Sequence, residues 1–318
     1  MRTMQRKRII VDCDPGQDDA IALLMALGAP QRIDVLAVTC VAGNVPLRLT
    51  EWNARRVVEL AGREDVPVHA GCGRPLLRSL RTAEHVHGET GLDGSGLPDP
   101  QMPLAGTHAV DAILAMLAAE PEGSVTLCPL GPLTNIALAM VKDPVTFARA
   151  KEIVLMGGAM DLGNVTPAAE FNFHVDPHAA RIVFEFGLPI TMMGLDVTHK
   201  VLVTDHRLDA VRAIGNRQAQ AAHGMLEFYN RFDRDRERYG SDGAPLHDPC
   251  VIAWLLDASI FSGRDCHVGI ETDSGSCMGR SVVDWWRSTD VPANAHVVSG
   301  VDEDAFFGLL EASLRAFP

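Results

Sequence analysis

The chain has 318 residues, of which 47% are hydrophobic and 22% are charged, a composition typical of a globular protein with a sizeable core. Its formal net charge of −13 argues against a nucleic-acid-binding or anionic membrane surface, because such surfaces need basic patches. Seven scattered cysteines without a CxxC pair indicate reduced thiols. We expect a cytoplasmic protein with neither a signal peptide nor a membrane span, because no apolar run is long enough for either.

Apolar runs alternate with segments of helical periodicity through about residue 196. Strands are predicted at 8–13, 35–41, 66–69, 125–128, 153–156 and 189–193. Helices are predicted at 18–28, 47–62 and 107–119, after the turn at 129–135, and at 177–186. This alternation predicts an α/β fold with an open, mainly parallel, Rossmann-like sheet and helices on both faces.

The remainder of the chain is more helical. Helices are predicted at 205–214, 216–239, 248–256 and 303–315, with short strand-like pieces between 264 and 300. The stretches 71–101 and 161–174 are predicted as irregular loops, of the length that usually serves a function. Because there is no internal repeat and no convincing linker, we expect a single domain over residues 1–318 with a helical C-terminal part.

Four carboxylates crowd the end of the first predicted strand. Asp12 and Asp14 leave the strand on the same side, Pro15-Gly16 make a turn, and Asp18 and Asp19 fall in the first turn of the next helix. One such residue alone would be a turn or N-cap residue. Two carboxylates about 5 Å apart repel by roughly 3 kcal/mol, and a helix dipole does not offset several such pairs. The cluster therefore predicts a site for a hard divalent cation, or a catalytic site.

Two further polar clusters follow later strands. Asn164, Glu170 and Asn172 offer hydrogen-bond donors and acceptors suited to a polyhydroxyl ligand, or they belong to a solvated loop. Asp248 precedes Pro249 at a predicted helix start, so it is either an N-cap or a functional carboxylate. The neighbouring His247 is a turn residue or a general acid.

Histidines give an alternative metal site. His85 and His87 lie in the glycine-rich loop and are either surface histidines or, together with His247, zinc ligands. The acid-rich cluster favours a hard, oxygen-bound cation over zinc.

At this point the motifs match a known family. The stretch DCDPGQDDAIAL at 12–23 resembles the N-terminal signature of nucleoside hydrolases of the inosine–uridine type. Further matches follow in order along nearly the whole chain: VAGN at 41–44, HGETGLDG at 87–94, GPLTNIALA at 131–139, LMGGAM at 155–160, GNVTPAAEFNFHVDP at 163–177, GLDVTHK at 194–200 and GAPLHDPC at 243–250. Each piece alone is weak, but the combination is specific.

The resemblance implies the nucleoside hydrolase fold, a Ca²⁺-dependent N-ribosyl hydrolase activity and a set of site residues. Calcium ligands would be Asp14, Asp19, Asp248 and the backbone carbonyl of Leu130. Asp14 would also take the proton from the attacking water. Ribose contacts would be Asp18, Asn44, Met156, Asn164, Glu170, Phe171 and Asn172, with His87 near the base. Asp12 is left without a direct role, and we expect it to brace the loop by hydrogen bonds.

Departure of the base needs protonation or burial of its developing charge, and His247 and Tyr229 are the candidates. The motifs look most like pyrimidine-preferring bacterial members, so we expect cleavage of uridine and cytidine, with purine-tolerant hydrolysis of inosine as the alternative.

A metal-dependent phosphohydrolase is the rival enzyme class, although no phosphate-binding loop is present in the sequence. A non-catalytic sugar-binding protein is a third reading. The family is commonly oligomeric, so a homodimer or homotetramer is expected.

Overall fold

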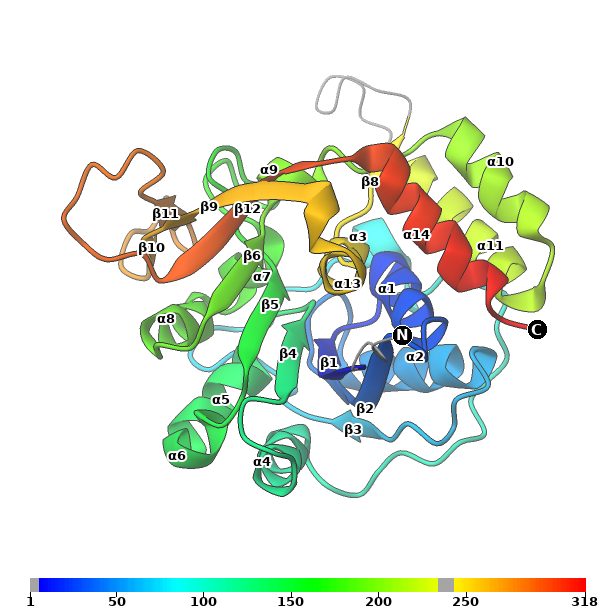
Figure 1. Cartoon of the computed structure of the whole chain (residues 1–318), viewed down its shortest axis with the longest axis horizontal. Helices are drawn as coiled ribbons and strands as arrows, with labels where there is room; N and C mark the ends of the chain where they lie inside the picture. Colours follow the sequence, from blue (N-terminus) through cyan, green and yellow to red (C-terminus); the bar gives the residue numbers. More distant parts are fainter. Residues whose placement is uncertain (1–5, 234–242) are drawn as a thin grey trace, which may run out of the picture.

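The computed structural model describes residues 6–233 and 243–318 of the chain. Eight strands form the main sheet in the spatial order β3-β2-β1-β4-β5-β6-β12-β9 (Figure 1). Their bounds are β1 (Lys7–Cys13), β2 (Ile33–Cys40), β3 (Val68–Ala70), β4 (Val125–Pro129), β5 (Glu152–Met156), β6 (Ile190–Met193), β9 (Phe261–Cys266) and β12 (Ala295–Val301). Neighbouring strands are parallel except β9, which runs antiparallel to β12, so the predicted mainly parallel sheet is confirmed.

Helices cover both faces of this sheet, as predicted (Figure 1). One face carries α1 (Gln17–Leu27), α2 (Leu47–Leu60), α11 (Arg217–Asp233), α13 (Pro249–Leu256) and α14 (Glu303–Arg315), with α10 (Asp205–Ile214) against α11 and α14. The other carries α4 (Ala109–Ala119), α5 (Thr134–Lys142), α6 (Pro144–Phe147) and α8 (Pro177–Glu185). Each face of the sheet has its own hydrophobic core, and successive side chains of a strand point to opposite faces. Ile9 and Val11 of β1 therefore pack in the core beneath α1, and Ile10 packs in the core beneath α4 and α5.

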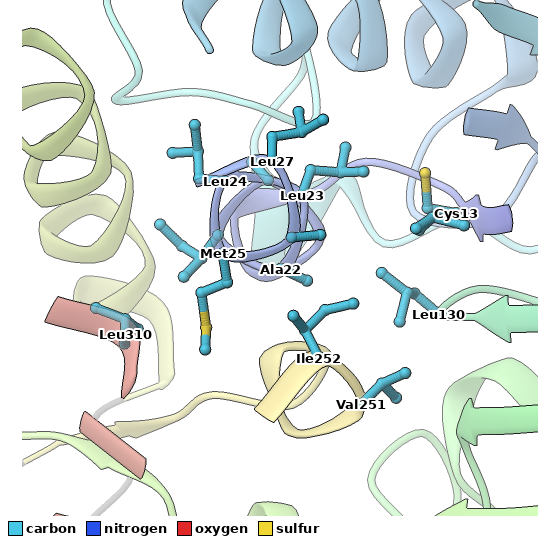
Figure 2. Close-up of a cluster of buried hydrophobic side chains, with 14 of the residues drawn as sticks. Cys13, Ala22, Leu23, Leu24, Met25, Leu27, Leu130, Val251, Ile252 and Leu310 are labelled. Atoms are coloured by element: carbon cyan, nitrogen blue, oxygen red, sulfur yellow. The ribbon is translucent and has the colours of Figure 1, made fainter. Parts of the chain in front are cut away.

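Helix α1 is buried along its whole length. Apolar side chains leave it on every side, and Figure 2 shows Met25 near Leu310 of α14 while Ile252 of α13 lies below the helix. A helix that is apolar all round is stable only when other elements surround it. Here α13, α14, α2 and α11 surround it, and its first turn is thereby held firmly at the carboxyl end of β1.

The strand order reverses direction at β1. The chain moves from β1 to β2 and β3 on one side, then returns as β4 on the other side of β1. Ligands of such sheets bind in the crevice at this switch point, outside the carboxyl ends of the strands. Asp14 follows β1 and Leu130 follows β4, and the Leu130 N–H donates to the Asp12 carbonyl at 2.7 Å. The topology therefore brings the acidic stretch that follows β1 next to Leu130, at the start of the turn that follows β4.

Several predicted segments differ from the structure. The pieces predicted between 264 and 300 include β12, which extends the main sheet by pairing parallel with β6, and the hairpin strands β10 (Val268–Ile270) and β11 (Ser281–Val283). The predicted loops contain the short helices α3 (Glu84–His87) and α7 (Phe171–Val175). The end of the helix predicted at 216–239 lies outside the described residues. The last short elements are α9 (Leu195–Thr198), the strand pair β7 (Leu202–Val203) and β8 (Ala244–Pro245), and a 3₁₀ turn at Ala258–Ile260.

Across residues 6–233 and 243–318, no helix combines the length and apolar character that crossing a bilayer requires.

Candidate active site

A cavity of about 310 Å³ lies at the carboxyl ends of the strands around the switch point. All but one of the residues that the sequence predicted for the site line this cavity: Asp14, Asp18, Asn44, His87, Leu130, Met156, Asn164, Glu170, Phe171, Asn172, Tyr229, His247 and Asp248. The exception, Asp19, lies beside it in the carboxylate cluster. Segments far apart in sequence thus meet at one site.

The carboxylates of Asp18, Asp19 and Asp248 each place an oxygen within 4.8 Å of the others, and all three side chains are buried. The first two come from the first turn of α1, and the third precedes α13, which packs against α1. Three buried carboxylates at this distance form an oxygen donor set of the kind that Ca²⁺ and Mg²⁺ prefer.

Asp14 is held tightly against two glycines. A Cβ at Gly43 would lie 2.0 Å from one carboxylate oxygen of Asp14, and a Cβ at Gly131 would lie 2.2 Å from the other. The Asn44 N–H donates to Asp14 Oδ2 at 2.6 Å, and the Asn44 side-chain amide donates to the Asp14 carbonyl at 3.1 Å. Only glycine lets the backbone come this close to the carboxylate, so the turn sequences around the site are themselves part of its construction.

Burial raises the pKa of each carboxyl in this cluster. It raises the pKa of Asp18 to about 7, with the charge of Asp19 adding to the rise. It raises the pKa of Asp19 to about 6, and hydrogen bonds with the Gly16 N–H and with Asp248 limit that rise. The pKa values of Asp14 and Asp248 are raised by burial and then by their acidic neighbours. A bound cation would oppose this effect by favouring the charged forms, so the donor set fits a hard divalent metal.

Of the acids that could have served as helix caps, Asp19 bonds the backbone at the start of α1, whereas Asp248 does not cap α13 with its side chain. Asp19 Oδ2 accepts from the Gly16 N–H at 3.0 Å, and its Oδ1 accepts from the Asp14 N–H at 3.2 Å. Asp248 stands at the N-cap of α13 with Pro249 behind it, yet its side chain makes no capping hydrogen bond. Its carboxylate joins the acidic cluster instead of the helix end.

Asp12 braces the floor of the site, as expected. Its Oδ1 accepts from the Thr39 hydroxyl at 2.5 Å and from the Asn135 amide at 2.8 Å. The same amide donates to the Cys40 carbonyl at 3.0 Å, and Asn135 Oδ1 accepts from the Cys72 N–H at 2.8 Å. Asn135 therefore ties β1, β2 and the loop after β3 together. The sequence places Asn135 in the turn at 129–135 and in the motif GPLTNIALA, but assigns it no role of its own.

Another part of the cavity lining is built from side-chain amides and backbone groups. Asn172 Nδ2 donates to the Leu130 carbonyl at 2.7 Å and to the Met156 carbonyl at 3.3 Å. Asn164 Oδ1 accepts from the Phe171 N–H at 2.9 Å. These bonds fix the orientation of both side-chain amides. The carbonyl oxygen of Asn172 is left as an acceptor for a ligand, and the NH₂ group of Asn164 is left as a donor.

Glu170 is occupied by the backbone. Its Oε1 accepts from the Asn172 N–H at 2.8 Å, and its Oε2 accepts from the N–H groups of Gly158 at 2.9 Å and Phe173 at 3.2 Å. This carboxylate caps α7 and joins it to the turn after β5. Burial raises its pKa to about 7 despite these donors.

The short helix α3 and helix α11 form another wall. The rings of His87 and Tyr229 stack with centroids 5.8 Å apart at an interplanar angle of 22°. Gln17 Nε2 donates to the carbonyls of His87 at 2.9 Å and Asp93 at 3.1 Å. Gln17 sits among the predicted acids but was not itself predicted, because a single glutamine in a helix start carries no recognisable signal.

His247 lies beside a second polar pair that sequence reasoning missed. Its Nδ1 is 2.7 Å from the Thr198 hydroxyl, and its ring centroid is 5.6 Å from that of His199. Both partners belong to the motif GLDVTHK, whose position after β6 was the available clue. The hydroxyl orients the imidazole toward the cavity that His247 lines.

The zinc hypothesis finds no support within the described ranges. His85, His87 and His247 all line the cavity. Among the described residues, however, the side chains whose ligand atoms lie close enough together to share one metal ion are those of Asp18, Asp19 and Asp248. The oxygen-bound cation is therefore the better interpretation.

The sheet, the switch-point cavity and the buried carboxylates define an α/β enzyme with an oxygen-rich site for a polar small molecule. Comparison with known proteins gives the family. Residues 9–308 match the family model described as inosine-uridine preferring nucleoside hydrolase, so the chain belongs to this family and is an N-ribosyl hydrolase acting on ribonucleosides. The resemblance seen in the sequence is thereby confirmed, and the phosphohydrolase class is not supported.

Curated relatives match nearly the whole chain. The pyrimidine-specific ribonucleoside hydrolase RihA of Shewanella sp. (strain ANA-3) is 49% identical over 309 residues, covering 97% of this chain and 96% of that protein. RihA of Photobacterium profundum is 48% identical over 309 residues, covering 97% and 99%. An uncharacterized protein of Schizosaccharomyces pombe is 47% identical over 312 residues, covering 98% and 100%.

Solved structures agree with the fold. The plant nucleoside hydrolase PpNRh1 superposes with a TM-score of 0.89 at 33% identity, covering 98% of this chain and 99% of that chain. The purine-preferring ribonucleoside hydrolase of Gardnerella vaginalis has a TM-score of 0.89 at 30% identity, covering 97% and 98%.

We predict that Asp248→Asn raises the unfolding temperature of the cation-free protein at pH 8. A carboxyl whose pKa is raised by folding destabilises the folded state increasingly as the pH rises above its pKa in the unfolded chain, and the neutral amide removes this cost. The expected rise is about 2–4 °C for each kcal/mol of relieved repulsion, measured by calorimetry in chelator. The matched control Asp161→Asn, at an exposed position, should leave the unfolding temperature unchanged. A fall with Asp248→Asn would contradict the electrostatic interpretation.

Proposed function

We propose that this enzyme uses Ca²⁺ to hydrolyse the N-glycosidic bond of ribonucleosides and prefers uridine and cytidine. The observation that carries the proposal is the single cavity that joins a buried carboxylate cluster to oriented amides. Its acidic floor suits a cation and a developing positive charge, and its amide wall suits sugar hydroxyls.

Asp14, Asp19, Asp248 and the carbonyl of Leu130 are the proposed calcium ligands. All are oxygen donors: Asp14 follows β1 and Leu130 follows β4, both line the cavity together with Asp248, and Asp19 belongs to the carboxylate trio with Asp18 and Asp248. The Leu130 carbonyl already accepts one hydrogen bond from Asn172, and a carbonyl oxygen has a second lone pair for a metal. Ca²⁺ accepts such a mixed set more readily than Mg²⁺, which demands near-ideal octahedral geometry.

When bound, Ca²⁺ supplies positive charge that keeps the neighbouring carboxylates ionised and lowers the pKa of the attacking water. Asp14 is the proposed base that takes the proton from this water. Its carboxylate is fixed between Gly43 and Gly131, so little reorganisation accompanies the proton transfer. Cleavage develops positive charge on the ribose ring, and the surrounding carboxylates stabilise that charge.

The ribose hydroxyls are proposed to lie between Asp18 and the amide wall. Asn172 turns its acceptor and Asn164 its donor away from the backbone groups that orient them, which matches the mixed hydrogen bonding of hydroxyls. Glu170 supports this wall through its three backbone bonds. Asn44, Met156 and Phe171 complete the proposed sugar contacts from the cavity lining.

His247 and Tyr229 are the proposed groups that assist departure of the base. Both line the cavity, and His247 is oriented through its Nδ1 contact with the Thr198 hydroxyl at 2.7 Å. Tyr229 is stacked on His87, so its ring is held against the same wall. A proton delivered to the base as the glycosidic bond breaks lowers the barrier to its departure.

The pyrimidine preference rests on relatives. The proteins named as pyrimidine-specific share 48–49% identity with this chain, whereas the one named as purine-preferring shares 30%. We predict a higher kcat/KM for uridine and cytidine than for inosine, measured by following the loss of nucleoside and the release of free base. A higher kcat/KM for inosine than for uridine would overturn the preference and favour a purine-tolerant enzyme.

We predict that Ca²⁺ raises the unfolding temperature of the chelator-treated protein, because a ligand that binds only the folded state stabilises it by mass action. The rise should shrink or disappear in Asp248→Asn, while Asp161→Asn, with its exposed side chain, keeps it. Activity lost to a chelator should return with Ca²⁺. Recovery with Mg²⁺ or Zn²⁺ but not with Ca²⁺ would assign a different ion.

We predict that Asp14→Asn lowers kcat by at least about 10³-fold, since it removes both a base and a ligand charge. The asparagine keeps the shape of the side chain between Gly43 and Gly131, so far-ultraviolet circular dichroism should match the wild type. Near-normal kcat in this variant would refute Asp14 as the base.

A further inference from the structure

The side-chain amide of Gln17 has a determined orientation. The residue is fully buried at the start of α1, and one end of its amide contacts the carbonyl oxygens of His87 at 2.9 Å and Asp93 at 3.1 Å. Carbonyl oxygens only accept hydrogen bonds, so this end must be the NH₂ group. The other end is therefore the oxygen, and it lies 2.8 Å from Nδ1 of His87.

This orientation decides where His87 carries its proton. An amide oxygen only accepts, so Nδ1 of His87 must be the donor. Burial lowers the pKa of His87 to about 3, and the nearby His85 adds to this effect, so the imidazole is neutral. A neutral imidazole carries one N–H, and the remaining nitrogen, Nε2, is a hydrogen-bond acceptor.

The ring is also fixed in place. Its Nδ1 edge abuts the turn before α1, where a Cβ at Gly16 would lie 2.4 Å away, and Tyr229 stacks on its face. The two ring nitrogens can form hydrogen bonds in different directions, and Nε2 makes no hydrogen bond to any described residue. His87 lines the cavity, so Nε2 is the polar atom that this side chain offers to a ligand.

Further hydrogen bonds hold the loop that carries His87 against α1 and α2. Asn53 Nδ2 donates to the Pro15 carbonyl at 3.1 Å and to the Thr90 carbonyl at 2.8 Å. The Ala83 N–H donates to the Asn44 carbonyl at 2.8 Å on the other side of α3. The loop is thus anchored at both ends, and the Gln17 contact lies between these anchors.

We propose that Gln17 is a positioning residue that holds His87 as its Nδ1–H tautomer, so that Nε2 accepts a hydrogen bond from an N–H on the edge of the substrate's base. This inference rests on the proposed function, because it assumes that the nucleoside base lies against the wall formed by α3 and α11. Uracil offers its N3–H to such an acceptor, and cytosine offers its exocyclic amine. A base without an N–H there would leave Nε2 unpaired and would be rejected.

The tautomer can be tested without substrate. In ¹⁵N-labelled protein, the imidazole signals of His87, assigned from their absence in His87→Gln, should show a protonated Nδ1 and an unprotonated Nε2. Gln17→Met retains the side-chain length but removes the acceptor, so the signals should shift toward protonated Nε2. A wild-type spectrum with Nε2 protonated would overturn the proposal. The wild-type spectrum alone decides this point, even where the variants fail to fold.

Recognition of the N–H is tested with wild-type enzyme and three nucleosides. Relative to uridine, 3-methyluridine lacks the N3–H and should lose about 10–100-fold in kcat/KM. The control 5-methyluridine keeps the N3–H while adding a methyl group of the same size, and should stay within a few-fold. In Gln17→Met the advantage of uridine over 3-methyluridine should shrink. Equal turnover of uridine and 3-methyluridine by the wild type would overturn the proposal.

Failure of the proposed pyrimidine preference can be distinguished from failure of the proposed role of Gln17. If inosine is cleaved and uridine is not, the proposed pyrimidine preference is wrong, and the same comparison is made with inosine and 1-methylinosine, which lacks the N1–H. Loss of 1-methylinosine turnover together with protonated Nδ1 supports the role of Gln17. Undiminished turnover of 1-methylinosine refutes it.

Discussion

Repulsion among buried carboxylates is the constraint on which the rest of this site depends. Asp14, Asp18 and Asp19 leave one turn together, Asp248 joins them from another helix, and burial raises the pKa of each. Backbone N–H groups and the positive end of α1 compensate only part of this negative charge. The arrangement is stable without a cation only at a cost in free energy, which is the usual condition of a metal site built in advance of its ion.

Rigid elements keep that cost from being relieved by movement. Helix α1 is surrounded on all sides, as Figure 2 shows, so its first turn cannot swing the acids into solvent. Gly43 and Gly131 close on Asp14, and Asn135 fastens β1 to β2 beneath it. Preorganisation of this kind lets charged groups act on a substrate without first paying for reorientation. The amide wall is equally fixed, since Asn164, Asn172 and Glu170 are each held by backbone groups of the chain.

The limits of prediction follow from the range of the interactions involved. The parallel sheet up to β6 was predictable, because each strand is a short buried apolar run followed by a periodic helix. The return of β12 to the edge of β6 was not, because pairing between distant strands depends on the packing of everything between them. The short helices α3 and α7 were also missed, since four or five residues carry too little periodicity for recognition.

The sequence by itself determined the family, the fold class and most of the residues that line the cavity, because those residues lie in recognisable motifs, many of which follow strands whose ends meet at one edge. Only the tertiary structure decided how each polar atom is used. It turned Asp248 from a helix cap into a member of the acidic cluster, gave both oxygens of Glu170 to the backbone, and set the Gln17 amide against His87. Hydrogen-bond partners are chosen by direction and distance in three dimensions, and residue order does not specify either.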